Sequence, residues 1–456
     1  MAADQSLASH PVSFHVQPTP LYQYSNTQHN QLWAVLSSVA GQIRDWKGAP
    51  LNVSAFMNPW VEQAGFPRWA VPIWYELGGA VSNLHWLPPT GQPKKLKLAK
   101  GSSALPLILN YQGRGFYRTN YDAHNWLLII RTLQANPTSI DVLNRAQLIN
   151  DAFTLARAGQ LNYSTAIALA AYLQQEQAYV PWHSAEPELA YFSLMFADSL
   201  HYAVLRPFLL RLIRPAYERL GWDDARPSET SAWPHYLRAY ILGQACQLEL
   251  PACLGNASLR FSIFKTTCAQ AQSSFACSQI SGNLRPLVYC AGLASGSAED
   301  WAFLWRLFTA ETEPQERLAL MQGLACTREP WLIRRLLSEA ISGEVVRQHE
   351  SGQLFRFIAR HPVGRQLLWA FLSNNWASIR QHYGQSFLFN FNNMIQAATA
   401  HFNTAYQLHQ LESFMENEDL GAAAGVFQGQ VEVAQNNLAW MQQFSPDVLA
   451  AMATAI

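Results

Sequence analysis

The chain has 456 residues, a length that allows about two to four domains, each able to bury a core of its own. Lysine and arginine together number 31, as do aspartate and glutamate, so the net charge is zero and nothing suggests the basic surface that a nucleic acid requires. Only 14% of the residues are charged while 12% are aromatic, a composition that argues against a disordered chain and favours large, densely packed domains.

The first predicted element is a disordered leader over residues 1–21. It lacks the basic start and following apolar run of a signal peptide. The longest apolar stretches, such as Thr165 to Leu173, are shorter than the ~20 residues that span a bilayer, so no transmembrane segment is expected. The apolar end from Val448 to Ile456 is predicted to be a packed helix, with a cleaved lipid-anchor signal as the alternative.

Two helices and then a group of strands are expected next. Over residues 22–67, Leu32 with Trp33 marks the apolar face of one helix and Phe56 marks that of a second. Residues 68–122 change to the pattern of strands separated by Pro and Gly. The predicted strands lie in Ala70–Tyr75, His85–Leu87 and Leu105–Tyr111.

Residues 123–456 are predicted to be helical to the end of the chain, with Gly, Pro or Asn at the turns. In one example, Ser139 caps a helix whose apolar residues recur at helical spacing from Ile140 to Phe153, and Gly159 supplies the left-handed stop. No exact internal repeat is detected, yet helix pairs without intervening strands suit a curved α-solenoid.

Several segments resemble one family of enzymes. They are Leu107–Asn110 with the octapeptide Gly115–Asp122, the string Leu143–Gly159, and His361–Gly364. All are similar to the zinc aminopeptidase family that includes aminopeptidase N and the endoplasmic reticulum aminopeptidases. The resemblance covers about residues 22–456. It implies a mainly α fold, in which a small truncated β-sandwich is followed by a large α-solenoid that forms a HEAT or armadillo-like superhelical bowl.

The resemblance also divides the chain into domains. After the leader (1–21) come remnant helices of the catalytic domain (22–67), a truncated β-sandwich domain (68–122) and the α-helical C-terminal aminopeptidase domain (123–456). Complete family members carry zinc on His-Glu-x-x-His, where the two histidines bind the metal and the glutamate activates water. No such pentapeptide occurs here. The sequence therefore predicts no catalytic residue, no metal ligand and no cofactor in this chain.

Polar residues elsewhere receive structural interpretations. His183, Glu186 and Glu188 are interpreted as a helix start, with Ser184 as its cap, rather than as a metal site. No Gly-x-Ser-x-Gly elbow occurs, so nucleophilic catalysis has no support.

Three arginines inside family-like strings are candidates for binding a peptide. An arginine that faces a concave bowl can hold a peptide carboxylate with two hydrogen bonds. Helix-to-helix ion pairing is the alternative, and it explains these arginines without a ligand. The candidates are Arg145, Arg157 and Arg285. The expected partner is a peptide or protein, with a homodimer or association with a catalytic family member as further alternatives.

The six cysteines occupy informative positions. The resemblance implies two disulfides at positions where secreted family members have them, and a third, local bridge is plausible in a segment rich in Ser and Gln. Six reduced thiols are the alternative, because one sequence cannot fix connectivity. The two implied pairs are Cys246 with Cys253 and Cys290 with Cys326, and the third is Cys268 with Cys277.

Three glycosylation sequons, at Asn52, Asn162 and Asn256, agree with an oxidising route. The expected location is extracellular, in the secretory pathway or at the cell surface if the chain derives from a longer precursor, whereas Met1 without a signal peptide leaves the cytoplasm open. The expected function is that of an aminopeptidase N-like protein without its own catalytic zinc site, a peptide-binding or scaffold homologue. The alternative is a fragment or isoform of an active zinc metalloaminopeptidase.

Overall fold

The computed structural model describes most of the chain. The described residues are 33, 36–37, 40, 43–45, 47–62, 70–88, 95, 102–223, 231–384 and 388–455. The leader predicted over 1–21 lies outside them, as does most of the first helix predicted near Leu32. The chain folds as two compact units, one that ends with Ile108–Tyr117 and one that comprises Ala104–Leu107 and Arg118–Ile456.

The first unit contains the short strands of the molecule. Strand β1 (Val71–Ile73) pairs antiparallel with β4 (His85–Leu87), with Pro72 opposite Trp86. A second sheet has the order β3-β2-β5 and contains β2 (Tyr75–Leu77), β3 (Ala80–Val81) and β5 (Leu107–Leu109). Helix α2 (Val53–Glu62) precedes the strands. The first predicted strand is divided at Trp74, and each sheet stays small.

The family-like octapeptide forms the turn that follows β5. Asn110 adopts the left-handed conformation with φ 56° and is 2% exposed. Its side chain accepts a hydrogen bond from the Gly115 amide at 2.7 Å and donates one to the Gly115 carbonyl at 2.8 Å. Asparagine tolerates this conformation because its short amide can bond to nearby backbone. At the end of the octapeptide, Asp122 caps the first long helix by accepting from the Asn125 amide.

The second unit is built from helices α3 to α21, in agreement with the predicted mainly α fold. Proline stands in the first turn of many of them, where its missing N–H costs nothing. The helices are α3 (Ala123–Ala135), α4 (Val142–Arg157), α5 (Tyr163–Ala170), α6 (Tyr179–Phe196), α7 (Tyr202–Leu220), α8 (Trp233–Gln247), α9 (Pro251–Thr267), α10 (Ser274–Cys277), α11 (Arg285–Ala294), α12 (Ala298–Ala310), α13 (Pro314–Leu324), α14 (Pro330–Ser342), α15 (Gln348–Ala359), α16 (Pro362–Asn374), α17 (Trp376–Tyr383), α18 (Leu388–Thr399), α19 (Ala405–Asn417), α20 (Ala424–Gln443) and α21 (Ser445–Thr454).

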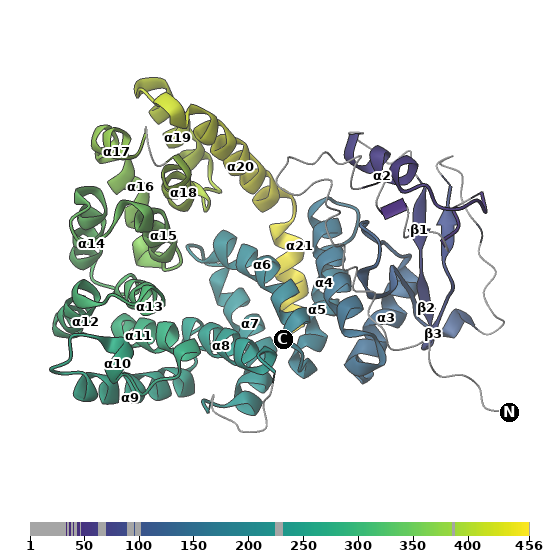
Figure 1. The fold of residues 1–456 in the computed structure, drawn as a ribbon, viewed down its shortest axis with the longest axis horizontal. Helices are drawn as coiled ribbons and strands as arrows, with labels where there is room; N and C mark the ends of the chain where they lie inside the picture. The colour runs from purple at the N-terminus through teal and green to yellow at the C-terminus, as the bar shows by residue number, and fades with distance from the viewer. Residues whose placement is uncertain are drawn as a thin grey trace, which may run out of the picture. The chain divides into compact units, whose positions relative to one another are not determined.

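The helices follow a curve that returns to its start (Figure 1). Helices two or three apart in the chain pack together, as α4 does with α6, α11 with α13 and α15 with α18. At the end of the curve, α21 packs against α5 and α7. Trp440 in α20 donates to the Tyr163 hydroxyl in α5 at 2.7 Å, and Asn403 donates to the Met195 carbonyl at 2.9 Å. The last helices therefore close the curve against the first ones.

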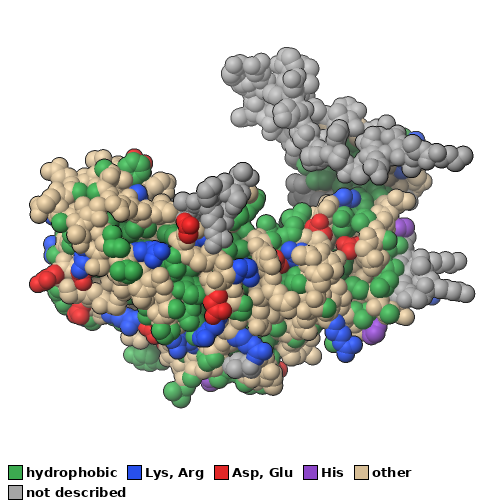
Figure 2. Space-filling view, turned by 90° about the horizontal axis from the view of Figure 1, so that it is seen from below, with side chains coloured by type: hydrophobic (Ala, Val, Ile, Leu, Met, Phe, Trp, Pro, Cys, Tyr) green, Lys and Arg blue, Asp and Glu red, His purple; other side chains and the backbone are tan. Residues whose placement is uncertain are grey.

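Apolar packing holds the curve together through a continuous core from α9 to α20. Trp301, Leu336 and Phe355 are examples of its fully buried members. Gly292 allows α11 to approach α9 closely, because a Cβ there would lie 2.3 Å from the Phe261 ring. Among the described helices, none is long and apolar enough to cross a membrane. Figure 2 shows acidic and basic side chains interspersed with apolar ones on the visible face.

Two details of the sequence prediction are wrong. Helix α4 begins at Val142 and is capped by Asp141, which accepts from the Leu143 amide, whereas Ser139 ends a preceding 3-10 turn. The expected stop at Gly159 holds, with φ 70°. Ser184 caps no helix, because α6 starts earlier, at Tyr179. The proline at position 181 lies in the first turn of α6, where a helix tolerates it, so the polar cluster after it is helix interior.

Candidate functional site

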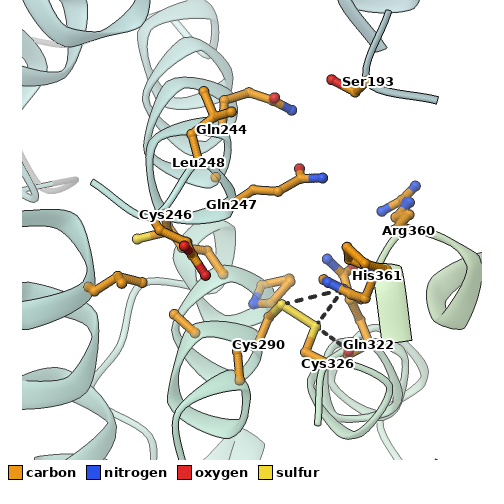
Figure 3. A pocket seen from close by; sticks show the side chains of 18 of the residues that line it. Ser193, Gln244, Cys246, Gln247, Leu248, Cys290, Gln322, Cys326, Arg360 and His361 are labelled. Atoms are coloured by element: carbon orange, nitrogen blue, oxygen red, sulfur yellow. Dashed lines mark hydrogen bonds between the residues drawn. A yellow bond between two sulfur atoms is a disulfide. The ribbon is translucent and has the colours of Figure 1, made fainter. Parts of the chain in front are cut away.

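The main candidate is a cavity of about 550 Å³ inside the helical unit (Figure 3). Its walls come from the end of α6, the start of α7, α8, α11, the end of α13 and the junction of α15 with α16. Gln244 and Gln247 on α8 extend into it, and Tyr240 lies one turn before them. The walls therefore combine apolar helix surface with amide groups that can bond to a polar ligand.

One end of the cavity is basic. Arg328, Arg360 and Arg365 all line it. Arg328 is paired with Glu249 at 2.5 Å. Arg360 is exposed and points into the cavity in Figure 3, and it makes no hydrogen bond or ion pair with any residue that the structure describes. Burial lowers the pKa of Arg360, and the Glu186 carboxylate partly offsets that effect without forming an ion pair. The cavity thus presents one guanidinium with no ion-pair partner among those residues.

Arg365 supports this basic end from inside the wall. It is 6% exposed, and its Nε donates to the Ala359 carbonyl at 3.1 Å. Its Nη1 is buried and has no hydrogen-bond partner in the described parts of the chain, with Asp198 Oδ2 at 3.7 Å. Burial lowers the pKa of this guanidinium, and the Asp198 carboxylate partly offsets that effect. A buried, incompletely bonded cation leaves positive potential at this end of the cavity.

His361 lies between the two arginines of the α15–α16 junction. Burial, and then the charges of Arg360, Arg365 and Arg328, lower its pKa to about 4. At neutral pH the imidazole is therefore uncharged. Its Nε2 lies 3.0 Å from Cys326 Sγ and 3.8 Å from Cys290 Sγ, beside the disulfide that those two cysteines form.

The structure contains three disulfides, in the pairs considered from the sequence. Both cysteines of the Cys290–Cys326 disulfide line the cavity. Cys246, which belongs to a second disulfide, lines it as well. The described residues contain no free cysteine. The three bridges are Cys246–Cys253, Cys268–Cys277 and Cys290–Cys326.

The three arginines singled out from the sequence lie elsewhere, outside the cavity lining, and each is paired with a glutamate. Arg145 is 6% exposed and reaches both oxygens of Glu176, at 2.7 and 3.1 Å. Arg157 bonds to Glu188 at 2.7 Å. These contacts join helices, which is the alternative that the sequence left open, and the peptide-binding role of these arginines stays a prediction.

The pairing recurs along the curve. Arg285 bonds to Glu316 at 2.7 Å, again 31 residues on, and Arg317 reaches both oxygens of Glu350, at 2.9 and 3.2 Å, after 33 residues. Arg145–Glu176 and Arg157–Glu188 have the same separation of 31 residues. The sequence showed no exact repeat, yet this spacing marks a structural one of the kind expected in a solenoid.

The three sequons differ in their surroundings. Asn52 and Asn162 are exposed. Asn256 is half-buried within α9, and its side-chain nitrogen donates to the Ala252 carbonyl at 2.9 Å. Glycosylation stays a prediction at all three, and Asn256 has the least accessible amide.

The arginine and glutamines that line the cavity are not among the residues predicted from the sequence. The string from His361 to Gly364 carries a family resemblance, but that resemblance does not include the adjacent Arg360. A signal was present, because two arginines flank a histidine and proline at a helix start. Nothing local to the string shows that Arg360 lacks a partner.

Comparison with known proteins matches this arrangement to one family. The family model of the ERAP1-like C-terminal domain matches residues 106–436. Aminopeptidase N from Homo sapiens is 30% identical over 94% of this chain and 47% of that protein. Aminopeptidase Ey from Gallus gallus is 28% identical over 92% of the chain and 46% of that protein, and thyrotropin-releasing hormone-degrading ectoenzyme from Homo sapiens is 27% identical over 96% and 44%.

The chain spans about half the length of the curated relatives it matches. The matched family region includes β5, the octapeptide turn and helices α3 to α19, together with every residue that lines the cavity. The chain therefore belongs to the ERAP1-like C-terminal domain family, as the resemblance of its sequence to the aminopeptidase N group implied.

Proposed function

We propose that the helical unit binds peptides in the cavity and that the 456-residue chain does not cleave them by itself. Arg360 carries this proposal. It extends into the cavity without an ion-pair partner in the described residues, and a guanidinium can bind a peptide carboxylate with two hydrogen bonds. The nearby positive charge of Arg365 adds attraction for an anion.

The remaining walls suit the rest of a short peptide. Gln244 and Gln247 offer amide donors and acceptors that can bond to a peptide backbone. Tyr240 and Ala291 supply apolar surface. The volume of about 550 Å³ falls within the range of roughly 300–1,000 Å³ typical of ligand sites, enough for one end of a peptide.

Non-catalytic binding follows from the chain's own residues. Zinc in this enzyme family needs two histidines on one helix, and the 456 residues include no His-Glu-x-x-His. The described residues bring together one group of three side chains able to ligate a metal, Cys290, Cys326 and His361, and two of these form a disulfide. That donor set does not fit the family's hydrolytic zinc site, so no catalytic step is assigned here.

A second function is favoured by the extent of the relatives. Because 94% of the chain aligns with only 47% of human aminopeptidase N, the sequence can be one part of a longer zinc metalloaminopeptidase that removes N-terminal residues from peptides. The cavity would then belong to the substrate-handling part of that enzyme. An in-frame His-Glu-x-x-His encoded upstream of Met1 would favour this function over the first.

An extracellular or secretory location is part of the proposal. The three disulfides support it, since such bonds persist in oxidising compartments. One relative is named as an ectoenzyme. The sequons at Asn52 and Asn162, which are exposed, agree with glycosylation along that route.

Fluorescence anisotropy with labelled short peptides tests the binding proposal. A peptide with a free C-terminal carboxylate is expected to bind the wild-type chain roughly ten- to hundredfold more tightly than its C-terminal amide, the ratio set by losing one charged hydrogen bond. Arg360→Met is expected to abolish that ratio. Arg356→Met is the matched control, since Arg356 lies one turn earlier on α15, is exposed and does not line the cavity.

Equal affinities for acid and amide, or equal effects of the two substitutions, would contradict the proposal. A parallel assay with aminoacyl fluorogenic substrates and elemental analysis for zinc addresses catalysis. Turnover with near-stoichiometric zinc would overturn the non-catalytic part and leave the peptide-binding part to the anisotropy result.

A further inference from the structure

Three metal-ligating side chains meet on the wall of the cavity. Cys290 extends from α11, Cys326 follows α13, and His361 precedes α16. Their sulfur and nitrogen atoms lie within 4.8 Å of one another. In Figure 3 dashed lines join the His361 imidazole to both sulfurs of the disulfide. No partner outside this unit is needed to complete the cluster.

The two nitrogen–sulfur distances suit a tetrahedral zinc ion, whereas the two sulfurs are bonded to each other. With Zn–S near 2.3 Å and Zn–N near 2.0–2.1 Å, a sulfur and a nitrogen on the same zinc lie about 3.5 Å apart. His361 Nε2 is 3.0 Å from one sulfur and 3.8 Å from the other, so the observed separations bracket that value. Two sulfurs on one zinc lie about 3.8 Å apart, so the cysteine side chains must rotate to separate them once the disulfide is reduced.

The surrounding packing would keep the cluster together without the covalent bond. Cys326 is 1% exposed and follows Leu324 and Ala325, which are fully buried in the apolar core. Tyr289, next to Cys290, is also fully buried, and its hydroxyl donates to Glu316 at 2.7 Å. These anchors fix the backbone beside both cysteines whether or not the sulfurs are bonded to each other.

The basic end of the cavity stabilises the thiolates of the reduced form. Thiolates rather than thiols bind metals, and nearby positive charge stabilises them. Arg328, Arg360 and Arg365 line the same part of the cavity. Two thiolates and a zinc ion sum to zero charge, so binding adds no net charge to this wall.

We propose that reduction of the Cys290–Cys326 disulfide turns this wall into a zinc site with Cys290, Cys326 and His361 as ligands. The reductant is a thiol or phosphine, whose two electrons, with two protons, convert the disulfide into two thiols. When zinc binds, both thiols release their protons and two Zn–S bonds form. The same chain thus carries a disulfide in an oxidising compartment and a metal site in a reducing one.

The test uses the whole folded chain, treated with a water-soluble phosphine and followed by equilibrium dialysis against zinc. The phosphine becomes a phosphine oxide with oxygen from water and offers no thiol that competes for the metal. The expected result is one zinc bound per reduced chain and none at this site in the oxidised chain. With cobalt in place of zinc, thiolate charge-transfer absorption and tetrahedral visible bands are expected.

Variants assign the ligands. Cys290→Ser with Cys326→Ser is expected to abolish the bound zinc, and His361→Ala to weaken it at least tenfold, the lower end of about 10–100-fold seen when even supporting partners of ligands are lost. His361→Gln is the second variant, should the alanine fail to fold. Cys246→Ser with Cys253→Ser is the matched control, because that bridge also borders the cavity but lies outside the described cluster.

Two results would overturn the inference. One is a reduced chain that keeps its helical circular dichroism but binds no zinc, or binds it equally well without Cys290 and Cys326. The other is a reduced chain that unfolds, since the inference requires packing to hold the cluster. Neither result depends on whether the cavity binds peptides.

Discussion

Arginines do two different things in the helical unit. Arg145 and Arg317 are buried, and each is held by two oxygens of a glutamate 31 or 33 residues further along the chain. Arg360 is exposed in the cavity and has no such partner in the described residues. The first kind joins neighbouring helices and the second presents a charge. A charged side chain therefore indicates a binding role when it lies in a cavity and no neighbouring residue neutralises it.

The largest expected effect comes from breaking a buried pair. Glu176→Gln leaves Arg145 charged and without its carboxylate, and Glu176 also accepts from the amides of Gln177 and Ala178. A loss of about 3–5 kcal/mol in the free energy of unfolding is expected, because the desolvated cation is left unpaired. Chemical denaturation monitored by circular dichroism measures it.

The matched control is Glu249→Gln, which makes the same change in an exposed ion pair. The side chain of Glu249 is 47% exposed and that of its partner Arg328 is 62% exposed. Solvent screens that pair, so its loss is expected to cost about 0–1 kcal/mol. If the two substitutions lowered the free energy of unfolding by similar amounts, the buried pair would stabilise the protein no more than the exposed pair does.

The next effect separates stability from binding. Arg360→Met removes a side chain that makes no hydrogen bond or ion pair with the described residues, so the free energy of unfolding should change by less than about 0.5 kcal/mol, as for most surface substitutions. Its affinity for a peptide carboxylate should fall as proposed above. Arg145→Met should show the reverse pattern, unfolding at lower denaturant in a chain whose cavity lining is unchanged. A large stability loss from Arg360→Met would place it with the bridging arginines.

The same comparison explains what could be predicted from the sequence. The helical spacing of apolar residues predicted the helical unit, and a glycine predicted the helix end at Gly159. Both features could be predicted because they depend on local backbone conformation. The cap at Ser139 was wrong, since Asp141 lies nearer the first turn and competes successfully for its amides. The importance of Arg360 could not be predicted, because it rests on which helices meet around it, information that no local pattern contains.

The partner of Arg145 could not be predicted from the sequence either. A family-like string pointed to the residue, but whether it met a peptide or a glutamate depended on the register of α4 against α6. Spacing of 31 residues between partners is visible only once several pairs are known. The structural repeat therefore emerges from contacts, even though the residues that make it are printed in the sequence.

The smallest expected effect compares two bridging glutamates by their response to acid. Burial alone would raise the pKa of Glu350, but hydrogen bonds from the Arg317 side chain and the Arg347 amide lower it overall. For Glu188, burial outweighs the attraction of Arg157 and raises the pKa. The pKa of Glu350 therefore lies below the ordinary value of a glutamate, and that of Glu188 lies above it.

The sign of each contribution follows from linkage. Because the folded pKa of Glu350 is lowered, its stabilisation is fully present above the ordinary value of 4.5 and is lost as pH falls through the folded value. Because that of Glu188 is raised, its stabilisation is present below 4.5 and is lost as pH rises through the folded value. The cost of Glu350→Gln should thus grow from acid toward neutral pH, whereas that of Glu188→Gln should shrink. Urea unfolding of both variants and the wild type between acid and neutral pH measures the two slopes, and slopes of the same sign would mean that the bridges are electrostatically alike and differ only in exposure.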